Sequence, residues 1–466
     1  MIIPAILRFL VFLLISIVLL ACQTLIPSIN PTPTSSPVPI SPTIAPTYSP
    51  VPTFTSVPTY TPTPLPPTLT PTPVATSTPT VTPISLLTQL SIFQSLWSVV
   101  NDTYVYPDFN GLDWDAINPE YREKITAGLS NQDFYLAMAE VISRLGDDHS
   151  FFLDPLQAAE QDSEYEGDHD YVGIGVLVVA VPARQHAVIL SVFPNSPAEA
   201  AGLQPRDSII SVDGTPILDE LGFLQDIVRG PEGTSIDISV QTPGERPRIL
   251  QITRHRITGD TPVFHTVITT AEGKRMGYIF LVTFMDGTVD DQVALALKEM
   301  TAKASLDGLI LDNRMNDGGS SLVFEPMLGY FIGGNLGHYI KHDEQTSLRI
   351  KLNDINASAQ LPLVVLVGSG TASFGELFAG VLQDSGRAYL IGTTTGGNVE
   401  VLWGYDFEDG SQLWLANETF RPLNHPEQDW EKSGVIPDLT VPGEFDEYSL
   451  NSDPAVKAAL KYLSEQ

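Results

Sequence analysis

The sequence contains a single cysteine, Cys22, so no disulfide can form within the chain. It is also poor in basic residues, because 24 lysines and arginines stand against 55 aspartates and glutamates, for a formal net charge of -31. So acidic a chain is not expected to bind nucleic acid, which requires basic patches. It has no Cys-x-x-Cys pair and no His-Glu-x-x-His motif, and its eight histidines are scattered. We therefore expect no metal site and no cofactor.

Charge is nearly absent from the start of the chain, where Arg8 is the one charged residue among residues 1–84. An apolar run over residues 9–20 ends at Cys22 in the sequence Leu-Leu-Ala-Cys. This tetrapeptide resembles a bacterial lipobox, in which the signal peptide is cleaved after a small residue and the cysteine is acylated. We expect residues 1–22 to be a lipoprotein signal peptide and Cys22 to carry the lipid anchor. An uncleaved signal anchor is the alternative, and both place the rest of the chain on the extracytoplasmic face of the cell membrane.

Composition divides the remaining chain into a stalk and three folded segments. Residues 23–84 are dominated by Pro, Thr and Ser, and because proline fixes φ and removes an amide donor, they predict a disordered, semi-extended stalk. Residues 85–165 are predicted to be helical, residues 166–257 to be rich in strands, and residues 258–466 to alternate strands with helices as an α/β domain does.

The helical segment is indicated by apolar periodicity. Phe93, Leu96, Trp97 and Val100 recur at the spacing of one helix face,. A second amphipathic helix covers residues 134–145, and the sequence Gly-Asp-Asp-His-Ser that ends at Ser150 follows it.

The strand-rich segment carries the motif Ser-Pro-Ala-Glu-Ala-Ala-Gly-Leu over residues 196–203, in which Ser196 caps a short helix with proline at its first position,. The sequence Asp-Ser-Ile-Ile-Ser-Val-Asp-Gly over residues 207–214 follows as a strand entering a turn. This pattern resembles the PDZ domain of bacterial proteases. The resemblance implies capture of a peptide C-terminus by strand addition. The strand expected over residues 172–176, with Gly173, Ile174, Gly175 and Val176, would supply the carboxylate loop and the edge strand.

A serine in the α/β segment lies where an acyl-transfer nucleophile would be useful. A strand expected over residues 361–367 runs into a turn of small residues, and a helix expected over residues 374–383 begins directly after Ser373. Free backbone amides at a helix N-terminus favour negative charge on a bound substrate. From the local pattern alone, Ser373 is either a nucleophile or an ordinary helix cap.

The segment Thr-Ala-Ser-Phe-Gly-Glu over residues 371–376 resembles the nucleophile segment of the tail-specific, or C-terminal processing, serine peptidases. In that pattern the nucleophile precedes the glutamate by three residues, which is Ser373 here. With the PDZ pattern, the resemblance spans roughly residues 88–445. It implies a crotonase-like α/β peptidase domain with a mixed sheet, and a polypeptide substrate held by its C-terminus.

The general base departs from the processing peptidases, which place a lysine 25 residues after the nucleophile, where this chain has Asn398. The tricorn core protease and its relatives resemble this chain more closely here, because they use Ser, His and Glu. The matching positions are His149 and Glu431. A neutral imidazole accepts a hydroxyl proton near neutral pH, and a carboxylate fixes its tautomer and stabilises the imidazolium.

An oxyanion hole is expected close to the nucleophile. Residues 312–319 read Asp-Asn-Arg-Met-Asn-Asp-Gly-Gly and resemble the Asp-x-Arg-x-Asn-x-Gly-Gly turn of the family. Glycines allow backbone amides to approach a ligand closely. We expect the amide of Gly318 or Gly319, together with that of Phe374, to bind the carbonyl oxygen.

Two alternatives stay open at the level of sequence. The missing lysine at Asn398 is compatible with a catalytically silent peptide- or ligand-binding protein on the same fold, as interphotoreceptor retinoid-binding protein shows. The second alternative keeps the enzyme and recruits Lys432 or Lys351 as the base.

Overall fold

The computed structural model describes residues 83–147, 149–165, 171–342 and 344–466, which all belong to one compact unit that begins at Pro79. The predicted signal peptide with Cys22, and nearly all of the predicted stalk, lie outside the described residues. Within the described ranges no helix combines the length and the apolar character needed to cross a membrane.

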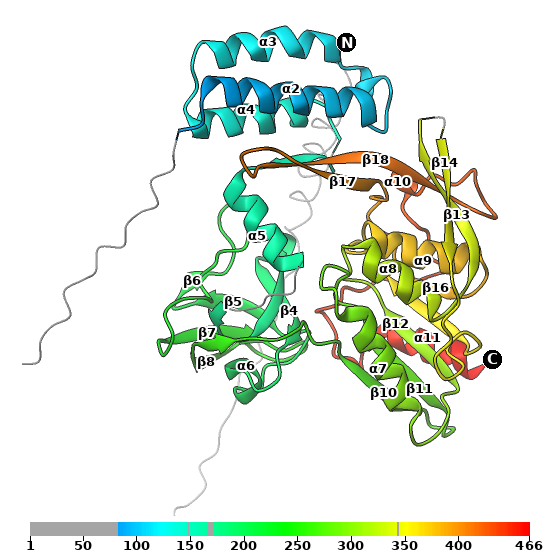
Figure 1. The fold of residues 1–466 in the computed structure, drawn as a ribbon. Coiled ribbons are helices and arrows are strands. Elements are labelled where there is room, and N and C mark those ends of the chain that lie inside the picture. The colour runs from blue at the N-terminus through cyan, green and yellow to red at the C-terminus, as the bar shows by residue number, and fades with distance from the viewer. Residues whose placement is uncertain (1–82, 148, 166–170, 343) are drawn as a thin grey trace, which may run out of the picture. The chain divides into compact units, whose positions relative to one another are not determined.

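Three capped helices form a layer at the start of the described chain (Figure 1). They are α2 (Leu86–Thr103), α3 (Trp114–Thr126) and α4 (Asn131–Ser143). The side chains of Ser85, Asp113 and Ser130 accept hydrogen bonds from the first-turn amides, which is the usual way to begin a helix,. The predicted apolar face is confirmed, because Phe93, Leu96 and Val100 are fully buried and Trp97 is partly buried against the same core.

This helical layer packs on a five-stranded sheet. The buried helix residues form one cluster with Leu413, Leu415 and Ala416 of β18. The sheet contains β1 (Phe151–Leu153), β13 (Gly334–Lys341), β14 (Glu344–Ile350), β17 (Val401–Asp406) and β18 (Gln412–Pro422). Residues 85–165 are therefore not helical throughout, because β1 pairs with β18 before α5 (Pro155–Tyr165) begins.

The segment predicted to be a PDZ domain is a β-structure around the short helix α6 (Pro197–Ala200), which Ser196 caps as expected. Its strands are β2 (Tyr171–Gly173), β3 (Val176–Val181), β4 (His186–Val192), β5 (Ser208–Val212), β6 (Thr215–Pro216), β7 (Ser235–Gln241), β8 (Arg248–Thr253) and β9 (His255–Ile257). The main sheet has the order β3-β4-β5-β7-β8, and β2 pairs with β9. The prediction of one strand over residues 172–176 is wrong, because the chain bends at Gly175, whose φ of 83° is incompatible with a strand,.

The peptidase segment is built on a mixed sheet with the order β10-β11-β12-β15-β16-β19. The strands are β10 (His265–Thr269), β11 (Arg275–Phe280), β12 (Gly308–Asp312), β15 (Leu363–Val367), β16 (Tyr389–Gly392) and β19 (Leu439–Thr440). The pair β10–β11 is antiparallel and the other pairs are parallel. The predicted mixed α/β class is confirmed.

Helices cover both faces of this sheet because successive strand residues point to opposite sides. The helices are α7 (Val289–Thr301), α8 (Ser321–Gly329), α9 (Phe374–Asp384), α10 (Trp430–Ser433) and α11 (Pro454–Ser464). Leu309 and Leu311 pack with α7, α8 and α9, whereas Ile310 packs with α11. Val188 and Leu190 of β4 join the α11 side, so the PDZ segment packs against the peptidase sheet.

Candidate active site

Ser373 lies between β15 and α9 in a strained backbone conformation. Its φ of 51° and ψ of -129° are rare for a residue with a side chain and cost about 1–3 kcal/mol,. The neighbouring turn offsets that strain, since the Ser373 amide donates to the Asn398 carbonyl at 2.5 Å and the Ala372 amide to the Asn316 carbonyl at 3.1 Å. The hydroxyl makes no capping hydrogen bond to α9. It is therefore held at a helix N-terminus without serving as the cap.

The glycine turn after β12 lies directly against Ser373. A Cβ on Gly318 would be 2.7 Å from the Cβ of Ser373 and 2.9 Å from the amide nitrogen of Phe374. The Gly318 amide donates to Asn316 Oδ1 at 3.0 Å, whereas a Cβ on Gly319 would meet the backbone of Phe284. Within the described ranges, the amides of Phe374 and Gly319 donate no hydrogen bond to the protein. Of the two glycines, Gly318 is nearer to Ser373, but its own amide donates to Asn316.

His149 lies in the loop between α4 and β1, which one carboxylate organises. Asp147 Oδ1 accepts from the amides of His149 at 3.0 Å and Ser150 at 2.6 Å, and Asp147 Oδ2 accepts from the Tyr104 hydroxyl at 2.6 Å. Tyr104 follows α2, so the helical layer determines where the imidazole lies.

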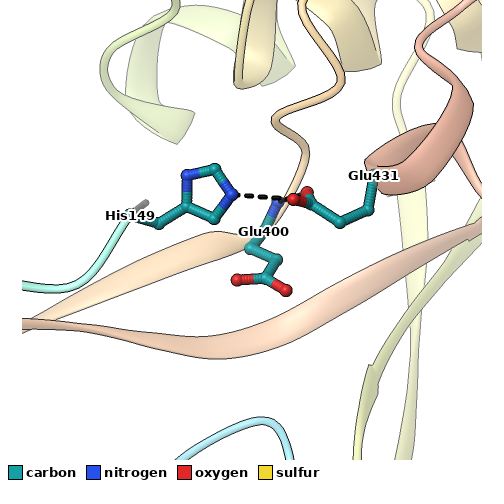
Figure 2. A group of neighbouring side chains, drawn as sticks. All are labelled: His149, Glu400 and Glu431. Atoms are coloured by element: carbon teal, nitrogen blue, oxygen red, sulfur yellow. Dashed lines mark hydrogen bonds and ion pairs between the residues drawn. The ribbon is translucent and has the colours of Figure 1, made fainter. Parts of the chain in front are cut away.

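The His149 ring and the Glu431 carboxylate are paired, with 2.7 Å between Nε2 and Oε1 (Figure 2). Glu431 is the second residue of α10, and its Oε2 accepts from the amides of Val399 at 2.8 Å and Glu400 at 3.3 Å. The imidazole side chain is only 8% exposed. Burial by itself would lower its pKa, but the hydrogen bond and charge of Glu431, with the charge of Glu400, outweigh burial and raise the pKa,.

One loop, residues 395–400, joins this pair to Ser373. Its Asn398 carbonyl accepts from the Ser373 amide, and the next amide, that of Val399, donates to Glu431. In the described part of the chain, Ser373 Oγ and the His149 ring make no hydrogen bond with each other. The ring nitrogen not engaged by Glu431 is Nδ1, on the other side of the imidazole (Figure 2).

Comparison with known protein families and relatives shows which family the chain belongs to. The model of Peptidase family S41 matches residues 275–441, that of the PDZ domain residues 188–242, and that of the Tricorn protease C1 domain residues 89–143. The chain is similar to the chloroplastic C-terminal processing peptidase of Tetradesmus obliquus, with 30% identity over 368 residues that cover 76% of this chain and 77% of that protein. The chain belongs to peptidase family S41.

Other members support the same placement. The carboxyl-terminal-processing protease of Synechocystis is 29% identical over 376 residues, which cover 79% of this chain and 85% of that protein. The solved photosystem II D1 C-terminal processing protease has a TM-score of 0.55 and 27% identity, covering 76% of this chain and 93% of that one. The chain is thus a tail-specific serine peptidase with a PDZ domain.

Glu376, which the sequence identifies only as the end of the Thr-Ala-Ser-Phe-Gly-Glu segment, has a structural role. Glu376 of the peptidase is fully buried in the first turn of α9. It accepts from the amides of Gly397 at 2.9 Å and Asn398 at 2.6 Å, and from the Thr395 hydroxyl. Burial raises the pKa of Glu376 despite these hydrogen bonds. The position of the family lysine therefore carries an asparagine whose backbone links Glu376 to Ser373.

The sequence gives no indication of a second buried glutamate, Glu400. It is 3% exposed, Oε1 accepts from the Tyr106 hydroxyl, and Oε2 is buried without a hydrogen-bond partner. Burial, with the nearby charge of Glu431, raises its pKa to about 7, although the Tyr106 hydrogen bond opposes the shift,. No local sequence pattern indicates Glu400, because its hydrogen-bond partner Tyr106 is 294 residues away.

The lysines proposed as alternative bases are exposed. The Lys432 side chain is 81% exposed and pairs with Asp429 at 3.1 Å, and Lys351 is exposed at the end of β14.

The predicted peptide-binding residues of the PDZ domain lie at the junction of β2 and β3. Gly173 ends β2, and Val176 begins β3 at the edge of the main sheet. The carbonyl of Ile174 accepts from the Ala198 amide at 2.8 Å, and that of Gly175 from the Phe193 amide at 3.0 Å. A sheet edge is where a peptide adds as a further strand.

Proposed function

We propose that this peptidase cuts polypeptides with a Ser373–His149–Glu431 arrangement in place of a serine–lysine dyad. The observation that carries the proposal is the 2.7 Å contact between His149 Nε2 and Glu431 Oε1. Asn398 adds support, because the position of the family lysine provides only backbone contacts to Ser373 and Glu376.

In the proposed reaction, Ser373 Oγ attacks the scissile carbonyl carbon and passes its proton to His149. Because Glu431 engages Nε2, the accepting nitrogen is Nδ1, and Glu431 stabilises the imidazolium that forms. The Phe374 amide and a glycine amide of residues 318–319 stabilise the oxyanion. His149 then protonates the leaving amine, an acyl-enzyme forms on Ser373, and water repeats the sequence to release the acid.

Serine labelling and peptide hydrolysis test the proposal together. A fluorophosphonate should label the wild type and fail on Ser373→Ala. His149→Ala should lose about 10⁴–10⁶-fold in kcat, and Glu431→Gln about 10⁴-fold. Lys432→Ala is the matched control and should keep activity. Full activity in His149→Ala, with loss in Lys432→Ala or Lys351→Ala, would contradict the proposed base, and the absence of any labelling would favour a silent binding protein.

We further propose that the PDZ domain holds the substrate by its C-terminus, at the junction that contains Gly173, Ile174, Gly175 and Val176. The edge position of β3 and the glycines before it favour backbone capture of a carboxylate,. Peptides with a free apolar C-terminus should bind more tightly than their amides. Equal affinities would remove carboxylate capture from the proposal.

We also propose that Cys22 anchors the enzyme by lipid on the extracytoplasmic face of the membrane, because the Leu-Leu-Ala-Cys sequence follows an apolar run,. In a bacterial host, labelled fatty acid should be incorporated into the wild type and not into Cys22→Ala. Membrane retention of Cys22→Ala without label would favour the uncleaved signal anchor.

A further inference from the structure

Three side chains with metal-ligating atoms lie close together at the candidate active site (Figure 2). They are His149, Glu400 and Glu431, and one ligand atom from each lies within 4.8 Å of the others. No other group of three such residues occurs among the residues that the structure describes. Because the ligands come from positions 149, 400 and 431, a search for short metal-binding motifs does not find them.

Glu400 supplies an independent sign of a ligand. The residue is 3% exposed, and its Oε2 is buried without a hydrogen-bond partner in the described protein. The large majority of buried side-chain polar atoms have a hydrogen-bond partner. Within the described ranges no lysine or arginine forms an ion pair with Glu400 or Glu431, whose ion-pair partner is His149. Two carboxylates thus lie near one imidazole, and one oxygen of Glu400 has no hydrogen-bond partner in the described protein.

We propose that His149, Glu400 and Glu431 form a site for a divalent transition-metal ion, best matched by Zn²⁺, and that its occupation inhibits the peptidase. Zinc binds histidine nitrogen and carboxylate oxygen, and zinc sites with three protein ligands keep a fourth position open. Mg²⁺ and Ca²⁺ prefer oxygen ligands alone, so the histidine discriminates against them. With zinc–ligand distances of about 2.0–2.2 Å, tetrahedral ligand atoms lie about 3.3 Å apart. The 2.7 Å contact between His149 and Glu431 must therefore widen by about 0.6 Å.

The position of the imidazole proton explains why metal binding would inhibit the peptidase. The predicted inhibition rests on the proposed function, in which His149 is the base. In the proposed resting state the neutral imidazole carries its one proton on Nε2, facing Glu431. A metal ion that bonds to Nε2 therefore requires the other neutral tautomer, in which that proton has moved to Nδ1. No lone pair is left on the ring to accept the proton of Ser373, so the hydroxyl is not activated.

Binding is tested first in the Ser373→Ala protein, which retains all three ligands and removes catalysis from the measurement. Zn²⁺ is titrated against a colorimetric zinc chelator. We expect one tight site that 100-fold excess Mg²⁺ does not displace. Glu400→Gln keeps the shape of the side chain and should weaken the site about 10-fold or more, and Glu431→Gln should do the same.

The matched control is His425→Ala, in the same background. His425 pairs with Asp384 at 2.8 Å and its side chain is 53% exposed, so it represents the other histidine–carboxylate pairs of an acidic surface. Its removal should leave the tight site unchanged. Equal zinc affinity in Glu400→Gln, Glu431→Gln and the parent would overturn the metal site, and so would loss of the site in His425→Ala.

Activity separates this inference from the proposed function. Zn²⁺ should inhibit the wild-type peptidase, EDTA should reverse the inhibition, and Glu400→Gln should need about 10-fold more Zn²⁺ relative to its own uninhibited rate. Tight binding at the three ligands without inhibition would overturn inhibition and the role of His149 as base, while the metal site would stand. Activity that depends on His149 but no tight site would overturn the metal inference and leave the proposed catalytic arrangement intact.

Discussion

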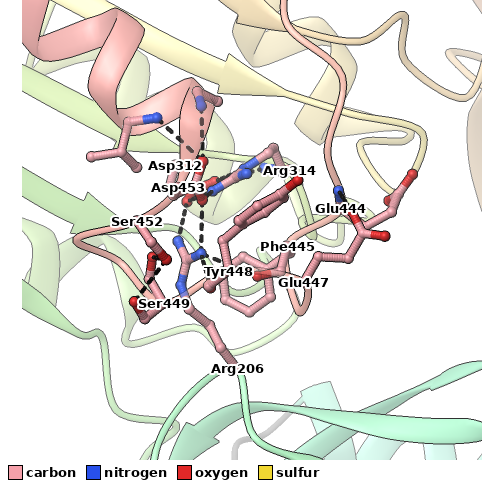
Figure 3. Close-up of polar contacts among 12 residues, drawn as sticks. Arg206, Asp312, Arg314, Glu444, Phe445, Glu447, Tyr448, Ser449, Ser452 and Asp453 are labelled. Carbon is pink, nitrogen blue, oxygen red and sulfur yellow. Dashed lines mark hydrogen bonds and ion pairs between the residues drawn. The ribbon is translucent and has the colours of Figure 1, made fainter. Parts of the chain in front are cut away.

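The first prediction concerns Arg206, which links the PDZ domain to the peptidase domain through buried ion pairs. Arg206 reaches Asp453 at 2.7 Å and Asp312 at 3.3 Å, and its guanidinium lies 4.3 Å from the ring centre of Phe445 (Figure 3). Arg314 binds the same two aspartates at 2.6 and 2.7 Å. The four charged side chains are at most 7% exposed, so two buried positive charges balance two buried negative charges.

Arg206→Met removes one positive charge while keeping an unbranched apolar stem against Phe445. The network is left with one uncompensated negative charge. Removing one partner of a buried ion pair costs about 3–5 kcal/mol. We expect the lower end, about 3 kcal/mol, because Arg314 still binds both aspartates. Urea unfolding followed by circular dichroism should show this loss as a lower midpoint.

The control comes from the same domain. Arg229 pairs with Asp226 at 3.7 Å, with side chains 57% and 70% exposed, and exposed ion pairs contribute about 0–1 kcal/mol. Arg229→Met should therefore shift the free energy of unfolding by less than about 1 kcal/mol. A comparable loss in both variants would refute the argument from burial.

A second change tests charge balance directly. Asp453 Oδ1 caps α11 by accepting from the amides of Ala455 and Val456, while Oδ2 faces the arginines. Asparagine caps a helix about as well as aspartate, so Asp453→Asn removes the charge and keeps the cap. In the Arg206→Met background it restores neutrality and should recover about 1–2 kcal/mol of the loss. If the double variant loses the sum of the two single losses, the charge-balance reasoning is wrong.

Three further predictions follow from the active site and the domain interface. Gly318→Ala would place a Cβ 2.7 Å from that of Ser373, so kcat/KM for a peptide should fall about 10²-fold or more with an unchanged circular dichroism spectrum; unchanged kcat/KM would contradict the tight packing. Tyr104→Phe removes the hydroxyl that positions Asp147 and should lower kcat about 10-fold while KM stays within two-fold, as a positioning role requires. Burial would raise the pKa of Asp446, but the hydrogen bond from His186 and the charge of Arg184 lower it. Its stabilisation is therefore complete above about pH 3.9 and is lost as pH falls through the lower folded-state pKa. Asp446→Asn should flatten the dependence of unfolding free energy on pH below about pH 4, and an unchanged slope there would contradict the prediction.

Much of the fold was predictable because it is encoded over short stretches. The spacing of Phe93, Leu96 and Val100 predicts a buried helix face, and the structure has them fully buried. Ser196 caps a short helix with proline at its first position, as expected. The break at Gly175 was missed, because its φ of 83° goes with a close approach to Ser196, where a Cβ would come within 2.3 Å. The local sequence pattern does not predict a contact between two residues as far apart as Gly175 and Ser196.

The sequence alone determined the family pattern, the strand–turn–helix that holds Ser373, and the candidates His149 and Glu431, because residue spacing and motif order depend on neighbours in the chain. Only the tertiary structure decided that His149 binds Glu431, that Asn398 serves through its backbone, and that Glu400 lies buried beside them. The physical reason is that hydrogen-bond geometry, burial and charge balance depend on groups that are not neighbours in the sequence, such as His149 and Glu431, 282 residues apart. Their energies are set by where the packed layers bring those groups together.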